Sequence, residues 1–207
     1  MKKFSLYTHH KKILADTITP VSIYLKIRDK FPNSILLESS DYHANDNSFS
    51  YICCNPIASI NIENDMITQQ FPDGKEVVSK VSKSASEENL GGSSTNVPQV
   101  LESFAGSFSS GENNFKFINN GLFGYIAYDA VRYFEDIEIS KSKSLLEIPD
   151  IYYAVYQNII AINHFNNEAY IFAHCYESES NIDAIDHLIK VQSFSSYNFD
   201  FINSARC

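Results

Sequence analysis

Two apolar runs separated by a long polar segment constrain the fold of this chain more than any other feature. Ile35–Leu37 and Phe49–Cys54 are apolar, whereas Glu38–Ser48 between them is rich in Ser, Asp and Asn. Apolar runs of this length, bounded by turn-forming residues, are typical of strands joined by a connection. Glu38 and Ser39 stand where the first strand ends, so the strand could present their carboxylate and hydroxyl to a ligand. A solvated strand end is the commoner interpretation of such residues.

Local signals predict the neighbouring elements. Thr19 followed by Pro20 is typical of a helix start, with Thr as the N-cap and Pro at the first helical position. Asn64-Asp65 between apolar runs predicts a tight hairpin in which Ile62 lies opposite Ile67. The pattern predicts strands at Phe4–Thr8 (a short edge strand), Ile57–Glu63, Met66–Phe71 and Tyr125–Ala127, helices at Val97–Phe108 and Ser180–Ile189, and a central hairpin of Ile151–Ile162 with Glu168–Tyr176.

The segment Gly121–Asp136 combines glycines with a short polar turn. Glycine inside a strand, as at Gly124, indicates close approach of another backbone or a bulge. The glycine spacing does not match G-x-G-x-x-G and no G-K-S/T follows, which excludes a nucleotide-binding loop here. Asp129 and Arg132 are three residues apart at the start of a helical turn, a spacing that predicts a salt bridge between them.

A long polar segment interrupts the apolar pattern between Ser79 and Asn96. It consists mainly of Ser, Glu, Asn and Gly, with almost nothing to bury. Such composition predicts a mobile surface loop of about residues 79–96.

The composition indicates a folded, acidic protein. The chain has 207 residues, of which 44% are hydrophobic and 20% charged, and its formal net charge is -9. This balance is ordinary for a globular protein and disfavours binding to nucleic acid or to an anionic membrane, because both require clustered Lys and Arg. No apolar run approaches bilayer-spanning length. The N-terminus lacks the apolar segment of a signal peptide, so we expect a cytoplasmic protein.

Cysteines and histidines do not form a site that the sequence can identify. The cysteines are Cys53, Cys54, Cys175 and Cys207, without a C-x-x-C motif, which predicts reduced thiols. With a two-residue turn at Asn166-Asn167, His164 pairs with Ala169 and His174 with Ile159. These pairs lie on opposite faces of the hairpin, so the two histidines cannot share a metal ion. The residues alone therefore predict an α+β domain with one candidate polar pocket near Glu38 and Ser39.

Several motifs in order resemble a known enzyme family. They are Thr19-Pro20 with the helix after it, Leu36-Leu37-Glu38-Ser39-Ser40, Asn47-Ser48-Phe49-Ser50-Tyr51-Ile52 with Pro56, and the G-Y-x-x-Y-D-x-V-R-x-x-E pattern within Gly121–Glu135. From about Thr17 to Tyr176 the chain resembles the N-terminal part of anthranilate synthase component I, which belongs to the chorismate-utilising enzymes.

The resemblance implies a fold, a reaction and partners. It implies an α+β fold of antiparallel sheets with helices packed outside, forming the N-terminal part of a two-lobed subunit. The implied reaction converts chorismate and ammonia to anthranilate and pyruvate with Mg²⁺, and a glutamine amidotransferase subunit (component II) supplies the ammonia. The family's catalytic and metal residues lie in a C-terminal half that residues 1–207 do not include. We therefore expect neither a catalytic residue nor a Mg²⁺ ligand in this chain.

The resemblance also implies an effector site for L-tryptophan, the feedback inhibitor. Glu38 and Ser39 fall on the family's L-L-E-S element, and Phe49 and Ser50 fall on the strand that faces it. Some relatives carry a basic residue where this chain has Phe49. The expected tryptophan-binding residues are thus Glu38, Ser39, Phe49 and Ser50.

Two alternative functions remain at this point. Aminodeoxychorismate synthase component I of folate synthesis shares much of the fold and some motifs. A non-catalytic amino-acid-binding or partner-docking module would need none of the missing half. The stretches Asn47–Asn55 and Tyr128–Asp136 favour anthranilate synthase over its folate counterpart.

Overall fold

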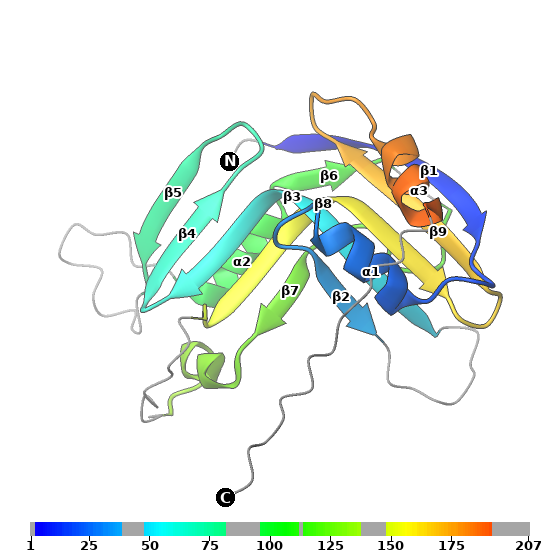
Figure 1. The fold of residues 1–207 in the computed structure, drawn as a ribbon. Coiled ribbons are helices and arrows are strands. Elements are labelled where there is room, and N and C mark those ends of the chain that lie inside the picture. Colours follow the sequence, from blue (N-terminus) through cyan, green and yellow to red (C-terminus); the bar gives the residue numbers. More distant parts are fainter. Residues whose placement is uncertain (1–2, 39–47, 82–95, 112–113, 138–147, 192–207) are drawn as a thin grey trace, which may run out of the picture.

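Two long antiparallel strands form the centre of a mixed sheet. The computed structural model describes residues 3–38, 48–81, 96–111, 114–137 and 148–191 (Figure 1). The strands are β1 (Phe4–Leu14), β2 (Ile35–Glu38), β3 (Phe49–Glu63), β4 (Met66–Gln70), β5 (Glu76–Lys80), β6 (Phe108–Ser110), β7 (Phe123–Ile126), β8 (Ile151–Asn163) and β9 (Glu168–Cys175). The helices are α1 (Pro20–Arg28), α2 (Val97–Ala105), α3 (Ile182–Lys190) and the 3₁₀ helix η2 (Tyr128–Tyr133).

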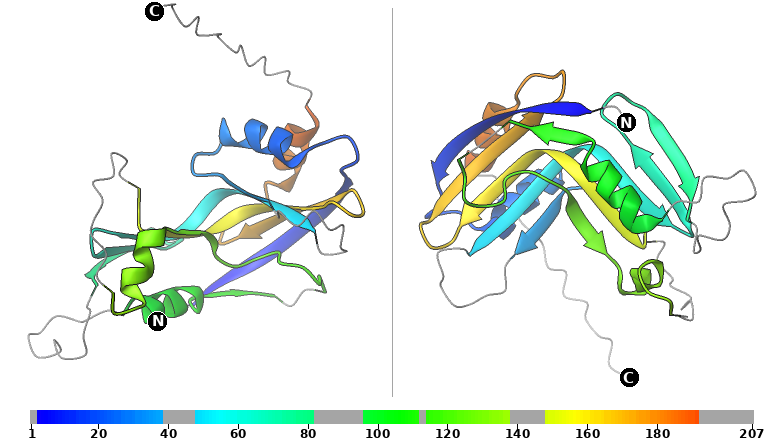
Figure 2. Two further views of the ribbon diagram at one scale, coloured as in Figure 1. Left: turned by 90° about the horizontal axis from the view of Figure 1, so that it is seen from below. Right: turned by 180° about the vertical axis from the view of Figure 1, so that it is seen from behind.

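The sheet has the order β5-β4-β3-β8-β9-β1-β6, with β2 paired to β3 and β7 paired to β8. Every pair is antiparallel except β1 with β6, which is parallel. Helices α1 and α3 cover one face and α2 covers the other, as the side view in Figure 2 shows. The predicted α+β class with helices outside the sheet is therefore confirmed. The sheet differs from the expected antiparallel one only in the parallel pair β1–β6.

A bulge divides β3 into two halves that serve different cores. The register with β8 shifts between Pro56 and Ala58, where Ile57 is the extra residue. Before the shift, the even-numbered Ile52 packs under α1 and α3, whereas after it the even-numbered Ile60 packs under α2. Side chains alternate along a regular strand, so one extra residue exchanges the faces. The two apolar runs that the sequence separates at Pro56 are one strand of 15 residues.

Two local predictions are confirmed by the backbone. Thr19 caps α1 by accepting a hydrogen bond from the Ser22 backbone N–H over 3.1 Å, and Pro20 begins the helix. Asn64 and Asp65 both have positive φ, 51° and 62°, as a two-residue turn that matches the strand twist requires. Ile62 and Ile67 face each other across this turn, as predicted.

Several predicted boundaries are wrong, including that of β7, which runs from Phe123 to Ile126 rather than from Tyr125 to Ala127. β1 extends to Leu14 and pairs with β9 as well as β6, so it is not a short edge strand. α2 ends at Ala105, because Gly106 caps it and Phe108 begins β6. The predicted loop at 79–96 overlaps the end of β5 at Ser79 and Lys80, and its residues 82–95 lie outside the described part of the chain. None of the described helices is long and apolar enough to cross a membrane.

Gly124 marks a close approach of two backbones, as its position in an apolar run predicts. It lies opposite Tyr153 in the β7–β8 pair, and a Cβ at this position would lie 1.9 Å from the carbonyl oxygen of Tyr152. A side chain cannot fit there unless β7 moves away from β8. Glycine at this position is therefore a condition for the strand pair to form.

Replacing Gly124 with alanine should destabilise the fold. The added methyl group forces a backbone shift, and overpacking of this kind costs about 1–3 kcal/mol or more. Urea unfolding of Gly124→Ala and Gly111→Ala would measure the difference in unfolding free energy. Gly111 is the matched control, because a Cβ there meets nothing within 4 Å. Equal stability of the two variants would contradict the proposed close approach.

Candidate functional site

The paired ends of β2 and β3 carry the polar residues that the sequence singles out. Glu38 lies directly opposite Ser50, and Ser50 lies opposite Ile162 on β8. Directly opposed residues project from the same face of a sheet, so Glu38 and Ser50 share a face. Glu38 is exposed, whereas only 1% of the Ser50 surface is accessible. Ser39 lies outside the described residues.

The imidazole of His164 joins this polar group from the end of β8. Its Nε2 lies 2.7 Å from Ser50 Oγ, and its backbone N–H donates to the Ser48 carbonyl over 3.1 Å. Where Ser50 donates to Nε2, the proton of a neutral ring sits on Nδ1, which is then a donor. Sequence reasoning did not assign His164 to this site, because 114 residues separate it from Ser50. The polar group therefore combines one carboxylate, one hydroxyl and one imidazole.

Phe49 is the predicted site residue that the structure separates from this group. It precedes Ser50 and therefore projects from the opposite face. Its ring packs on Phe117, with centroids 4.8 Å apart, and on Tyr51 at 6.0 Å. A ligand held by Glu38 and Ser50 would therefore lie across the sheet from the Phe49 ring.

The turn between β8 and β9 differs from the predicted one. Asn163 pairs with Glu168, so the turn spans the four residues 164–167 and His164 belongs to it. The side-chain oxygen of Asn163 accepts hydrogen bonds from the backbone N–H groups of Phe165 at 2.9 Å and Asn166 at 3.1 Å. This Asx-type capping stabilises the longer turn. The predicted pairing of His164 with Ala169 is therefore wrong, and Ala169 faces Ile162 instead.

His174 is buried on β9 and has both ring nitrogens bonded. Nε2 lies 2.8 Å from the Asn119 carbonyl oxygen and Nδ1 lies 2.9 Å from Thr8 Oγ1. A carbonyl can only accept, so Nε2 carries the proton and Nδ1 accepts from Thr8. His174 lies opposite Thr8 on β1, and the predicted partner Ile159 faces Phe172. Among the described residues, no three His, Cys, Asp or Glu side chains form a group that could hold a metal ion.

Arg132 has a different partner from the predicted one. Its Nη2 lies 2.7 Å from Asp150 Oδ2, whereas Asp129 receives only a hydrogen bond from Arg132 Nη1 to its backbone carbonyl, over 2.9 Å. The Tyr133 hydroxyl also donates to Asp150 Oδ2 over 2.8 Å. Asp150 stands immediately before β8, so this half-buried cluster ties η2 to the start of the central strand. Helical spacing could not identify an acid 18 residues away.

The described cysteines are buried, free thiols. Burial raises the pKa of Cys54 to about 12, and burial likewise holds the pKa of Cys53 well above its ordinary value. Both thiols therefore remain protonated at neutral pH, which makes them poor nucleophiles. Cys207 lies outside the described residues.

The stability of the fold should depend on pH through His174. Burial lowers the pKa of this imidazole, and the hydrogen bond to Asn119 opposes the shift only in part. His174 therefore binds a proton more readily in the unfolded chain than in the folded one. The free energy of unfolding then falls as pH drops from about 6.5 toward the pKa of His174 in the folded protein. The slope approaches about 1.4 kcal/mol per pH unit for one proton.

Urea unfolding between pH 7 and 5 would measure this dependence. His174→Gln should flatten the curve, because an amide does not titrate there, whereas His164→Gln is the control and should retain it. An unchanged curve in His174→Gln would show that another group governs the pH dependence.

Comparisons with known proteins identify relatives of this chain. No family model matches the sequence. Anthranilate synthase component 1 of Lactococcus lactis is 29% identical over 155 residues, which cover 74% of this chain and 29% of that protein. The proteins of the same name from Thermus thermophilus and Mycobacterium bovis are 26% and 25% identical, over 80% and 85% of this chain and 31% and 32% of theirs. The chain thus spans about a third of these relatives.

A solved structure gives a weaker likeness. The crystal structure of anthranilate synthase component I from Streptococcus pneumoniae has a TM-score of 0.46 and 18% identity, and the match covers 86% of this chain and 35% of that one. The sequence matches confirm the resemblance that the motifs indicate: this chain is similar to part of anthranilate synthase component 1.

Proposed function

We propose that this chain is the N-terminal, tryptophan-sensing part of an anthranilate synthase component I. The complete subunit would convert chorismate and ammonia to anthranilate and pyruvate, with ammonia from a glutamine amidotransferase subunit. The observation that carries this proposal is the sequence similarity to curated proteins of that name over 74–85% of the chain. Their shared name favours this assignment over aminodeoxychorismate synthase.

Mg²⁺ is part of the proposed reaction, and we assign it to the portion of the subunit outside this chain. The described residues contain no group of His, Cys, Asp and Glu side chains fit to hold the ion. We therefore derive no catalytic step from these residues. Their proposed role is to support the subunit and to bind the effector.

The geometry at the end of β2 supports the binding of an α-amino acid. Glu38 offers an exposed carboxylate to the ammonium group, and His164, with Ser50 donating to its Nε2, offers its Nδ1–H to the carboxylate. Hydrogen bonds to charged groups are the strong ones, so such a pair of contacts selects a zwitterion. Leu36, on the same face of β2 as Glu38, supplies apolar surface nearby. The rest of an indole pocket would come from the portion outside this chain.

The first test asks whether the chain needs the rest of the subunit. Incubated alone with chorismate, Mg²⁺ and ammonium salt, it should give no anthranilate fluorescence above background, because its proposed role is not catalytic. A chimera in which this chain replaces the corresponding segment of a full-length component I should convert chorismate to anthranilate. Turnover by the chain alone would contradict the proposal. Tryptophan binding without turnover in either form would favour a non-catalytic amino-acid-binding module.

The second test concerns Glu38. In the full-length chimera, Glu38→Gln should weaken tryptophan inhibition by about one to two decades, because a hydrogen bond to a charged group is worth about 1.5–3 kcal/mol. Turnover without tryptophan should remain. Glu63→Gln, at the far end of β3, is the matched control and should leave inhibition unchanged. Equal inhibition of both variants would remove Glu38 from the effector site.

A further inference from the structure

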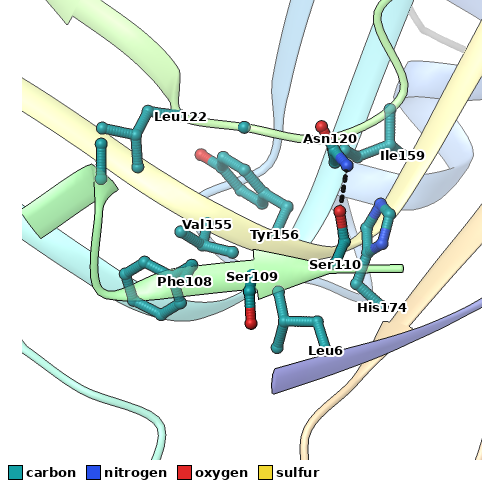
Figure 3. Close-up of a pocket in the computed structure, with 12 residues that line it drawn as sticks. Leu6, Phe108, Ser109, Ser110, Asn120, Leu122, Val155, Tyr156, Ile159 and His174 are labelled. Carbon is teal, nitrogen blue, oxygen red and sulfur yellow. Dashed lines mark hydrogen bonds between the residues drawn. The ribbon is translucent and has the colours of Figure 1, made fainter. Parts of the chain in front are cut away.

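A small pocket lies between strand β6, the segment 120–122 and the centre of the sheet (Figure 3). Its volume is about 130 Å³. The lining residues that carry the argument are Leu6, Phe108, Ser110, Asn120, Leu122 and Val155. Leu6, Phe108 and Val155 are part of the cluster that packs under α2. The pocket therefore lies on the face of the sheet opposite α1 and α3, away from the Glu38–Ser50 pair.

The lining excludes a charged ligand. Its walls are mainly aliphatic and aromatic side chains, and it contains no Asp, Glu, Lys or Arg. His174 is neutral in its bonded form and uses both ring nitrogens, toward Asn119 and Thr8. An ion that entered would lose its hydration without gaining a counter-charge, which costs several kcal/mol or more. The occupant must therefore be uncharged.

One end of the pocket carries a polar pair. Asn120 donates from Nδ2 to Ser110 Oγ over 2.5 Å, and Figure 3 shows both side chains at the same end as His174. Ser110 accepts in this bond, so its own hydroxyl proton remains available, and Asn120 retains its side-chain carbonyl as an acceptor. The Tyr156 hydroxyl already donates to the Asn33 carbonyl over 3.0 Å. The polar end can therefore satisfy one hydroxyl or amino group.

The volume limits the size of the occupant to one ring. An engineered cavity of about 150 Å³ lined by Leu, Ile and Phe binds benzene, and this pocket is slightly smaller. We propose that the pocket is a binding site for a small uncharged aromatic molecule, a single six-membered ring with one hydroxyl or amino substituent. The ring packs among Leu6, Phe108 and Val155, and the substituent bonds to Ser110 and Asn120. This proposal does not depend on the proposed function.

Titration with phenol, benzene and benzoate tests the chemical class. The full chain would be labelled with ¹⁵N and the amide shifts of Leu122, Val155 and Ile159 followed by NMR. Phenol should bind saturably at this pocket and about 2- to 12-fold more tightly than benzene, which lacks one neutral hydrogen bond. Benzoate should not bind. Phenol shifts that do not saturate, or that centre elsewhere, would overturn the site, and benzoate binding equal to phenol would overturn the class.

Matched serine variants test the polar end. Ser110→Ala should lower phenol affinity about 2- to 12-fold and leave benzene affinity unchanged. Ser59→Ala is the control, because Ser59 does not line the pocket and its hydroxyl donates to Gln70 Oε1 on β4 over 3.2 Å, so its loss should not affect either ligand. Equal phenol affinity in both variants would overturn the assignment of Ser110.

A filled pocket provides the final test. Val155→Phe should abolish binding of phenol and benzene by occupying the ring position. If this variant does not fold, Leu122→Phe, at the half-buried Leu122, fills the same space from the other side. Retained binding in a folded filled variant would place the ligand elsewhere and overturn the proposal.

Discussion

The bulge in β3 is the constraint on which the rest of the structure depends. Asn55 has a φ of 58°, which asparagine tolerates better than most residues, and its side-chain amide donates to Gln157 Oε1 on β8. If β3 alternated regularly through Ile57, without the bulge, Ile52 and Ile60 would project from the same face. The core under α2 would then lose Ala58, Ile60 and Ile62, which the second half of β3 contributes to it. Burial of one isoleucine is worth about 1.5–3 kcal/mol, so even two misplaced residues would cost much of a small domain's stability.

Local chemistry explains which parts of the fold could be predicted from the sequence. The Thr19 cap, the Asn64-Asp65 turn and the restriction at Gly124 depend on residues within a few positions of each other or on the backbone itself. The unpredicted features depend on distant residues or on side-chain capping. Arg132 forms its ion pair with Asp150 rather than with Asp129. The Asn163 side chain stabilises a four-residue turn where the Asn166-Asn167 pair predicts a two-residue turn.

The candidate effector site likewise has a part that the sequence could predict and a part that it could not. The sequence pattern of two facing strands could predict that Glu38 and Ser50 lie together, because register follows from strand pairing. Strand alternation also separates Phe49 from Ser50, because adjacent residues of a strand project from opposite faces. The pattern could not include His164, which contacts Ser50 from the turn after the neighbouring strand β8. Of the two residues that chemistry alone suggested, Glu38 lies in this strand pair and Ser39 lies outside the described residues.

The adjacent cysteines of β3 have a practical consequence. Cys54 is buried in the cluster under α1 and α3, whereas Cys53 is buried in the aromatic cluster with Phe172. Neither thiol can meet a modifying reagent until its own cluster opens, so the two labelling rates report separately on two regions of the interior. The pair is thus a built-in double probe: unequal rates would reveal that the two sides of the sheet fluctuate independently, and equal rates that they open as one cooperative unit.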